Sequence, residues 1–306
     1  MRVALLALVP LLGGACGGGA AKRPAISKAT TPVARTAGDR ILPLLPEGAQ
    51  LIVELDFARL RANPVVGKLV TQALTGPNLP MSSDIPMSPL ANVDALVLAS
   101  YGMGTSQAAT VTVLVTKDSV PNGVSVGEGL VALGPELWTA QLEARAAIAG
   151  VDQKLTASRE LLELRDHSMP PGAPGAALRI TARLSFDARV ALARQTGLDA
   201  PPGRISIWGD VVDDLAIIVD ADAVDPGDKK SKQPTKRLET GVRGMLAGLA
   251  SEPAIRALGI PSSLHGARIV AKGSWVRTII AIGPAHLQRV VQRADAMLSS
   301  QAPPSS

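Results

Sequence analysis

Two stretches decide the fold, Leu51-Ile-Val-Glu-Leu-Asp-Phe57-Ala-Arg-Leu and Leu178-Arg-Ile-Thr-Ala-Arg-Leu-Ser-Phe186-Asp-Ala-Arg-Val. They contain the two phenylalanines of a 306-residue chain. In each stretch an apolar run typical of a β-strand ends at the phenylalanine, and a helix-forming pattern of Ala, Arg and Leu follows. We therefore interpret the two stretches as one strand–helix unit that is present twice.

The ends of the two units match as well. Val131-Ala-Leu-Gly134-Pro135 is similar to Ile280-Ala-Ile-Gly283-Pro284, because each is a strand, a glycine that ends it, and a proline where a helix would begin. Each unit also opens with a turn cluster rich in Pro and Gly, at Pro43–Gly48 and at Pro170–Gly175. The order predicted for each unit is a strand, a helix, two or three strands, a further strand and a helix.

β-Branched and apolar runs predict the inner strands of both units. The runs lie at residues 93–100 and 110–116 in the first unit, and at 205–210 and 215–220 in the second. The second unit is longer because it has a charged loop at 225–236 and an added helix near 237–249.

We expect an α+β fold made of two tandem copies of an antiparallel sheet, with helices packed on one face. The two copies either share one continuous sheet or pack side by side. The expected segments are a signal peptide (1–15), a flexible tether (16–40), a first repeat (41–168), a second repeat (169–300) and a disordered tail (301–306).

The first residues have the pattern of an export signal. Arg2 is followed by an apolar run over residues 3–12 and then by the small residues Gly13, Gly14 and Ala15, as in a secretory signal peptide. The apolar run is about half of the ~20 residues that a helix needs to span a bilayer, so it predicts a cleaved leader rather than a permanent span.

Cys16, the single cysteine of the chain, directly follows this leader. With a cysteine at this junction, the leader resembles the lipobox of bacterial lipoproteins, although Leu12 stands one place earlier than the leucine of that motif. The resemblance implies that residues 1–15 are removed and that the Cys16 thiol receives a diacylglycerol, which anchors the protein to a membrane. The alternative is an ordinary leader cut after Gly19-Ala20-Ala21, which would leave a soluble protein that is secreted or periplasmic.

The start of the body carries a second, shorter resemblance. The pattern Leu45-Pro-Glu-Gly-Ala-x-Leu-x-Val-x-Leu-Asp looks like the start of repeats in uncharacterised bacterial lipoproteins and exported proteins of unknown function. This resemblance implies an exported α+β body and no particular activity.

The net charge of +5 comes from the N-terminal part of the chain. Residues 1–40 hold six of the 31 Lys and Arg residues and one of the 26 Asp and Glu residues, which leaves 25 of each sign in residues 41–306. A nucleic-acid-binding protein would carry its basic excess on the folded body, and an aromatic content of 2% leaves few rings for stacking on bases. We therefore exclude a nucleic-acid partner, and we interpret residues 17–40, rich in Gly, Ala, Thr and Pro, as a solvated tether.

One string has the form of a catalytic motif. Gly123-Val-Ser125-Val-Gly127 fits the G-x-S-x-G nucleophile elbow, and Asp213 or Asp220 followed by His265 or His286 would complete the hydrolase order. The elbow needs a strand before the serine and a helix after it, whereas the surrounding residues predict a turn and then a further strand. We therefore expect a loop serine without a catalytic role.

The sequence offers no metal or cofactor motif. His167, His265 and His286 are widely separated, and none has a partner at the spacing of a local metal pair. The acidic run 220–228 lacks the ligand spacing of a calcium loop and is followed by lysines. We expect no cofactor, no metal and no catalytic residues.

The function predicted from these observations is a lipid-anchored protein of the cell envelope, attached through acylated Cys16, with its body in the periplasm or at the cell surface. It would be a non-enzymatic binding or structural module with an envelope protein as partner. The alternatives are a soluble periplasmic ligand-binding protein with a cleft between the two copies, and an envelope serine hydrolase that uses Ser125.

Overall fold

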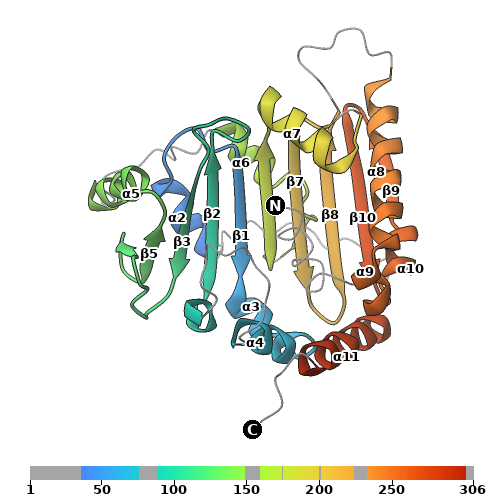
Figure 1. Ribbon diagram of the computed structural model, residues 1–306, viewed down its shortest axis with the longest axis horizontal. Coiled ribbons are helices and arrows are strands. Elements are labelled where there is room, and N and C mark those ends of the chain that lie inside the picture. Colours follow the sequence, from blue (N-terminus) through green and yellow to red (C-terminus); the bar gives the residue numbers. More distant parts are fainter. Residues whose placement is uncertain are drawn as a thin grey trace, which may run out of the picture.

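The structure is a computed structural model that describes residues 36–75, 88–148, 159–173, 175–199, 201–223 and 233–300. Cys16, the leader and the tether up to residue 35 lie outside the described residues, as does the tail from residue 301. The described residues form a single ten-stranded antiparallel sheet with helices around it (Figure 1). The α+β class predicted from the sequence is confirmed.

The strand order of the sheet is symmetrical. It runs β4-β5-β3-β2-β1-β6-β7-β8-β10-β9, so β1 and β6 meet in the middle. Each half continues outward in chain order for three strands, and its last two strands then follow in reverse order. The strands are β1 (Leu51–Asp56), β2 (Ala95–Tyr101), β3 (Ala109–Val115), β4 (Val124–Ser125), β5 (Leu130–Leu133), β6 (Leu178–Arg183), β7 (Arg204–Val211), β8 (Leu215–Asp222), β9 (Arg268–Lys272) and β10 (Trp275–Ile282).

The two halves share one continuous sheet, which decides between the two arrangements left open by the sequence. β1 and β6 pair antiparallel over five residues each, with Val53 opposite Ile180 at the centre. The four inner strands agree with the predicted runs to within about two residues, an ordinary uncertainty for element ends.

The helices begin where the sequence provides caps. Asp56 accepts a hydrogen bond from the Arg59 amide at the start of α3, and Ser185 accepts one from the Ala188 amide at the start of α7. The helices are α2 (Ala37–Ile41), α3 (Phe57–Ala62), α4 (Gly67–Thr75), α5 (Glu136–Ile148), α6 (Arg159–Arg165), α7 (Phe186–Thr196), α8 (Pro234–Ser251), α9 (Pro253–Leu258), α10 (Pro261–His265) and α11 (Pro284–Ser300), with short 3₁₀ turns η2 (Leu42–Leu44) and η3 (Ser88–Asn92). The added helix predicted near 237–249 is α8.

Side chains of each strand point alternately to the two faces of the sheet, and we name these the Glu54 face and the Val53 face after two neighbours in β1. In the first half the Glu54 face is apolar, with Val97, Val111 and Val113 at most 1% exposed. It is covered by α2, η2, α5 and the apolar side of α6. The ring of Trp138 in α5 stacks on Tyr101 there, with centroids 4.1 Å apart.

The Val53 face is covered at its margins. α3 and α4 pack below the first half, α8 packs over β9 and β10, α10 packs against β10, and α11 contacts both α4 and α9 (Figure 1). Helices therefore lie on both faces, whereas one helix-covered face was expected. The helices are divided because the chain leaves the sheet toward different faces. The connection between the halves, α5 and α6, lies on the Glu54 face, whereas α3 and α11 lie on the Val53 face.

The body begins earlier than predicted. Residues 36–40, assigned to the tether, form the start of the folded body, because Thr36 and Asp39 make a capping box at the first turn of α2. Ile41, the last residue of α2, is fully buried against the sheet. The boundary at residue 168 also shifts, because α6 packs against β6 and β7 of the second half.

Candidate functional site

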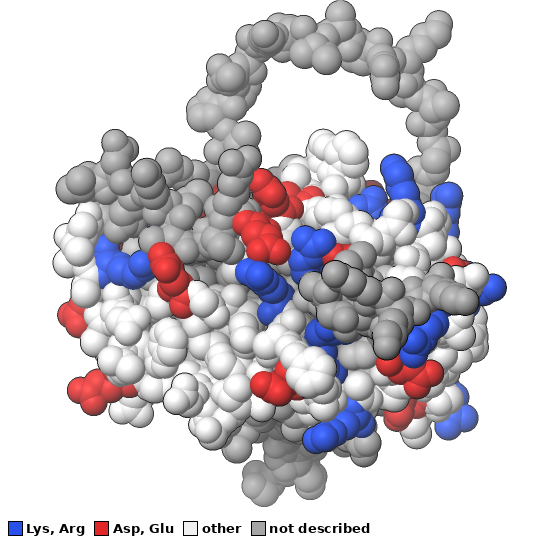
Figure 2. Space-filling view, turned by 90° about the horizontal axis from the view of Figure 1, so that it is seen from above, with Lys and Arg blue, Asp and Glu red and all other residues white. Residues whose placement is uncertain are grey.

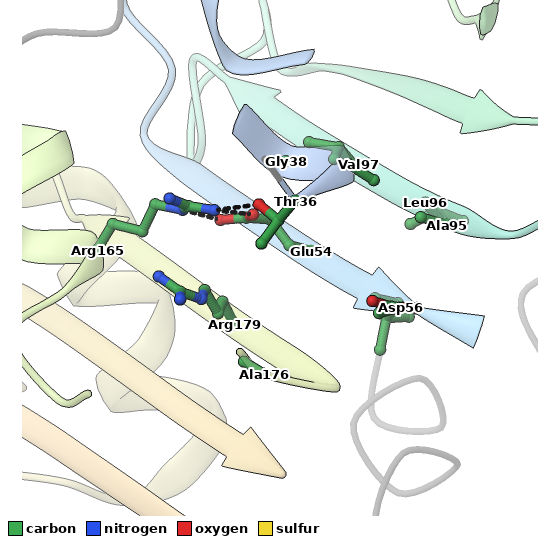
Figure 3. A pocket seen from close by; sticks show the side chains of 12 residues that line it. Thr36, Gly38, Glu54, Asp56, Ala95, Leu96, Val97, Arg165, Ala176 and Arg179 are labelled. Atoms are coloured by element: carbon green, nitrogen blue, oxygen red, sulfur yellow. Dashed lines mark hydrogen bonds and ion pairs between the residues drawn. The ribbon is translucent and has the colours of Figure 1, made fainter. Parts of the chain in front are cut away.

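The strongest cluster of charges in the described chain lies where α6 crosses the Glu54 face. Arg165, the last residue of α6, donates from Nε to Glu54 Oε1 at 2.5 Å and from Nη2 to Glu54 Oε2 at 2.7 Å. Its Nη1 donates to Asp39 Oδ1 at 2.9 Å. Figure 3 shows Arg165 reaching toward Glu54 with Thr36 beside them. Arg165 and Glu54 are each 8% exposed, so this forked ion pair is buried.

Opposite charges hold this cluster in its ionised form. Burial disfavours the charged form of Arg165, but its hydrogen bond to Glu54 and the charges of Glu54 and Asp39 raise the pKa of the guanidinium. Burial likewise opposes ionisation of Asp39, yet the Thr36 amide and Arg165 together hold the pKa of that carboxyl below its usual range. Arg165 therefore bridges the two acids in an ionised clamp that joins α2, β1 and α6.

The clamp depends on a close approach by Gly38. A Cβ added at Gly38 would overlap Glu54 Oε2 and lie 2.8 Å from Arg165 Nη2. Beside it is a hollow of about 20 Å³ lined by Gly38, Glu54, Arg165 and Arg179 (Figure 3). This volume holds about one water molecule, far below the ~300 Å³ of a typical ligand pocket, so we assign the clamp a structural role.

A second polar cluster covers the Glu54 face of the second half. His167 Nδ1 lies 2.8 Å from Asp220 Oδ2, and Arg277 donates to both oxygens of the same carboxylate at 2.8 and 2.5 Å. The His167 ring stacks on Trp275 with centroids 4.0 Å apart. Asp220 is 1% exposed, and its hydrogen bond raises the pKa of Arg277.

The residues after α6 lie directly on this polar face. Arg277 Nη2 donates to the carbonyl of His167 at 2.9 Å, the Ser168 amide donates to Ser206 Oγ at 3.2 Å, and Trp208 Nε1 donates to the Gly175 carbonyl at 2.9 Å. The polar side chains of the strands thus bind the backbone at His167, Ser168 and Gly175. We call the strand residues Ser206, Trp208, Asp220 and Arg277, together with His167 and Ser168, the polar seam.

A histidine beside a carboxylate is part of many hydrolase sites, which also need an accessible hydroxyl next to the histidine. Within the described residues His167 has no hydrogen bond to a hydroxyl. Its neighbour Ser168 is fully buried and lies 2.8 Å from Ser206. The polar seam therefore has the features of an internal hydrogen-bond network rather than of a nucleophilic site.

The catalytic arrangement considered around Ser125 is not assembled. Ser125 lies on the edge strand β4, and seven strand positions separate it from Asp220 on β8. At a spacing of about 4.8 Å per strand, the two are on the order of 30 Å apart. A short turn and β5 follow Ser125, instead of the helix of a nucleophile elbow.

The other histidines have separate structural surroundings. His286, in the first turn of α11, lies 2.8 Å from the Gly259 carbonyl through Nε2 and 3.4 Å from Ser263 Oγ through Nδ1. His265 ends α10. In the parts of the chain that the structure describes, no group of three or more His, Cys, Asp or Glu side chains is placed to hold a metal ion. Asp225 and Asp228 of the acidic run lie outside those parts.

Both charged clusters lie on the Glu54 face, and the centre of the Val53 face is a separate, apolar surface. One row of directly opposed residues crosses five strands, namely Leu98, Val53, Ile180, Ile207 and Val219. All five are half-buried, and the last four belong to none of the three hydrophobic core clusters. In Figure 1 the described helices surround this region, and none crosses the centre of β1, β6 and β7. We call these five residues the aliphatic row.

Sequence reasoning missed the aliphatic row and the buried ion pairs. A signal for the ion pairs was present, because Glu54 lies between Val53 and Leu55 in a strand, and Asp220 and Asp222 share one face of another strand. Charges at every second position of an otherwise apolar strand indicate a polar face that is covered. Cys16, the one site residue predicted from the sequence, lies outside the described residues.

Comparisons with known proteins add little to this description. No family model and no curated protein matches the chain. Among solved structures it is similar to crystal form I of TP0453, with a TM-score of 0.42 and 9% sequence identity over 84% of this chain and 98% of that one. This similarity is too low to carry an argument about function. No helix among the described residues is long and apolar enough to cross a membrane.

Proposed function

We propose that the protein is a lipid-anchored, non-enzymatic binding module of the cell envelope. In this proposal acylated Cys16 attaches the chain to a membrane, the residues up to 35 act as a tether, and the Val53 face binds the apolar side of an envelope protein. The observation that carries the binding role is the aliphatic row, which both halves of the sheet build together.

The dimensions of the row favour a helical partner. Five strands at about 4.8 Å spacing make the row about 19 Å long, the length of roughly 13 residues of α-helix. The helix pitch of about 5.4 Å is close to the strand spacing, so side chains on one face of a helix can follow the row from strand to strand. Aliphatic surface of this kind contributes to association mainly by leaving water.

The anchor is tested by labelled-palmitate incorporation with membrane fractionation of cells that make the native protein, Cys16→Ser or Gly17→Ser. We expect label and membrane retention for the native protein and for Gly17→Ser, and loss of both for Cys16→Ser. Mass spectrometry of the mature N-terminus provides the second readout. An acylated Cys16 supports the anchor, whereas an unmodified N-terminus at Lys22 would refute it.

The binding surface is tested separately by a photo-crosslinking amino acid placed at Val53 or Ile207 in intact cells. A matched position is Glu143, an exposed residue of α5. Protein adducts at Val53 and Ile207 but not at Glu143 support the proposed partner. Adducts to lipid alone, or the same adducts at all three positions, would refute it.

A further inference from the structure

The sheet has one long free edge, at β9. The strand order ends there, and β9 pairs only with β10 among the described residues. Four of its five residues are exposed, and Ile269 is half-buried against the helices of the Val53 face. The opposite edge is formed by β4, which has two residues. A free strand of five residues can hydrogen-bond to a further strand from another chain.

The hairpin geometry shows which backbone groups are free. Lys272 and Trp275 are opposite each other across the two-residue turn Gly273-Ser274, and Gly273 has a φ of 62°, as the first central residue of a type II′ turn requires. The closing pair of such a hairpin exchanges hydrogen bonds, and hydrogen-bonded pairs then alternate along the strands. The amides and carbonyls of Arg268, Val270 and Lys272 therefore point toward β10, whereas those of Ile269 and Ala271 point outward.

The side chains along this edge define the chemistry of an added strand. Arg268, Val270 and Lys272 lie on the Glu54 face, where they alternate as cation, aliphatic and cation. Val270 is 38% exposed. Neither Arg268 nor Lys272 forms an ion pair with any described residue. Opposed charges across neighbouring strands stabilise pairing, so this edge matches a strand that alternates acid, aliphatic and acid.

The surroundings strengthen the positive charge of the edge. The first turn of α8 lies next to the β9–β10 turn, because Thr235 Oγ1 donates to the Gly273 carbonyl at 3.2 Å. Lys236 and Arg237 follow directly and are exposed. Seen from above, Lys and Arg side chains are concentrated on the side of the molecule where α8 and β9 lie (Figure 2).

A second copy of the chain does not match this edge. If two β9 strands paired antiparallel about Val270, each Arg268 would face the Lys272 of the other copy, and like charges in opposed positions destabilise a sheet. The same cations thus disfavour self-association and favour an acidic partner.

We infer that the outer edge of β9 binds an extended acidic segment of a partner protein as an eleventh strand, with acid–x–aliphatic–x–acid side chains over Arg268, Val270 and Lys272. This surface is separate from the aliphatic row, so the inference does not depend on the proposed function.

The test uses the full-length protein and labelled peptides with the palindromic centre Glu-Thr-Val-Thr-Glu, which presents the same side chains in parallel and antiparallel pairing. Fluorescence anisotropy measures binding, and amide hydrogen exchange reports the Ile269 and Ala271 amides. Two control peptides have the centres Lys-Thr-Val-Thr-Lys and Glu-Pro-Val-Pro-Glu. We expect the first peptide to bind and to slow exchange at both amides, and both control peptides to bind at least about fivefold more weakly.

Three variants of the protein complete the test. Arg268→Glu with Lys272→Glu should reverse the preference toward the lysine peptide. Ala271→Pro should abolish binding without unfolding the protein, because the lost amide is outside the ladder to β10. Arg194→Glu with Arg289→Glu makes the same change of net charge at exposed residues of α7 and α11 and should bind like the native protein. Equal binding by both charge-reversed proteins, unprotected amides at Ile269 and Ala271, or no binding of the acidic peptide would overturn the inference.

Discussion

The two halves of the sheet have the same strand order but opposite chemistry on the Glu54 face. Under α2 and α5 the face of the first half is made of Val97, Val113 and similar side chains that are almost fully buried. Under residues 166–173 the face of the second half includes Ser206, Asp220 and Arg277. Arg277 binds Asp220, and Ser206 and Arg277 bind the segment above them. Ser206 and Asp220 are as deeply buried as these valines, at 0% and 1% exposed, so burial does not explain the difference.

The difference follows from what covers each half. A helix satisfies its own backbone hydrogen bonds, so the strands beneath it need only supply apolar area. An irregular segment has free amides and carbonyls that must find partners when they are buried. In the second half those partners are the side chains of the polar seam, for example Ser206 for the Ser168 amide. The cover of a sheet face thus determines the side chains that the strands can carry.

The largest expected effect concerns Arg165, which connects the two regions. Arg165→Leu leaves the carboxylate of Glu54 buried without its partner, and we expect a loss of about 3–5 kcal/mol in the free energy of unfolding. Urea denaturation followed by circular dichroism measures this loss. The matched control is Arg243→Leu, which removes an exposed pair with Glu239 on α8 and should cost at most about 0.5 kcal/mol.

We call this dependence of strand side chains on the cover of the sheet face the covering rule. The double variant Glu54→Leu with Arg165→Leu tests it directly. Because α6 is a helix, an apolar pair beneath its end should be tolerated, and we expect most of the lost stability to return. A double variant that is no more stable than Arg165→Leu would show that the clamp is needed for more than charge compensation.

The next largest effect is expected at Gly38, where α2 approaches the clamp. Gly38→Ala places a methyl group against Glu54 and Arg165, and we expect a loss of about 1–3 kcal/mol from overpacking. Gly244→Ala is a matched control, because nothing lies within 4 Å of a Cβ at that position of α8. It should stabilise the protein by about 0.5–1 kcal/mol, as alanine does for glycine inside a helix. Equal effects of the two variants would contradict the close approach.

Much of the fold could be predicted from the sequence, because the pattern that indicates a strand lies within the residues of that strand. The predicted runs at 205–210 and 215–220 lie inside β7 (Arg204–Val211) and β8 (Leu215–Asp222). The pairing of β1 with β6 could not be predicted, since it is made by backbone groups that every residue has. The clamp was missed for a related reason: Glu54 and Arg165 are 111 residues apart, and no local pattern couples them.

The covering rule also predicts the result of exchanging side chains between the halves. Ser206→Val removes the acceptor of the buried Ser168 amide, and we expect a cost of about 1–2 kcal/mol. Val113→Thr, a change in the first half, puts a hydroxyl among apolar groups beneath helices and should cost a similar amount. If Ser206→Val were neutral while Val113→Thr were destabilising, the polar seam would not be required by its cover. Thermal unfolding of both variants decides between these outcomes.

The smallest expected effect is the dependence of the clamp on pH through Asp39. The folded protein holds the pKa of this carboxyl below the value of about 3.9 expected for the unfolded chain. As pH falls through that value the unfolded chain takes up the proton first, so stability is lost on acidification, while the full contribution is present at neutral pH. Asp39→Asn keeps the capping oxygen but cannot titrate, so the free energy of unfolding of this variant should fall less steeply between about pH 5 and pH 2. The difference in slope between the two proteins should be smaller than the ~1.4 kcal/mol per pH unit that uptake of one whole proton would give. Parallel pH profiles for the two proteins, measured by urea denaturation, would show that Asp39 does not contribute to the charge compensation of Arg165, and the clamp would then rest on Glu54 alone.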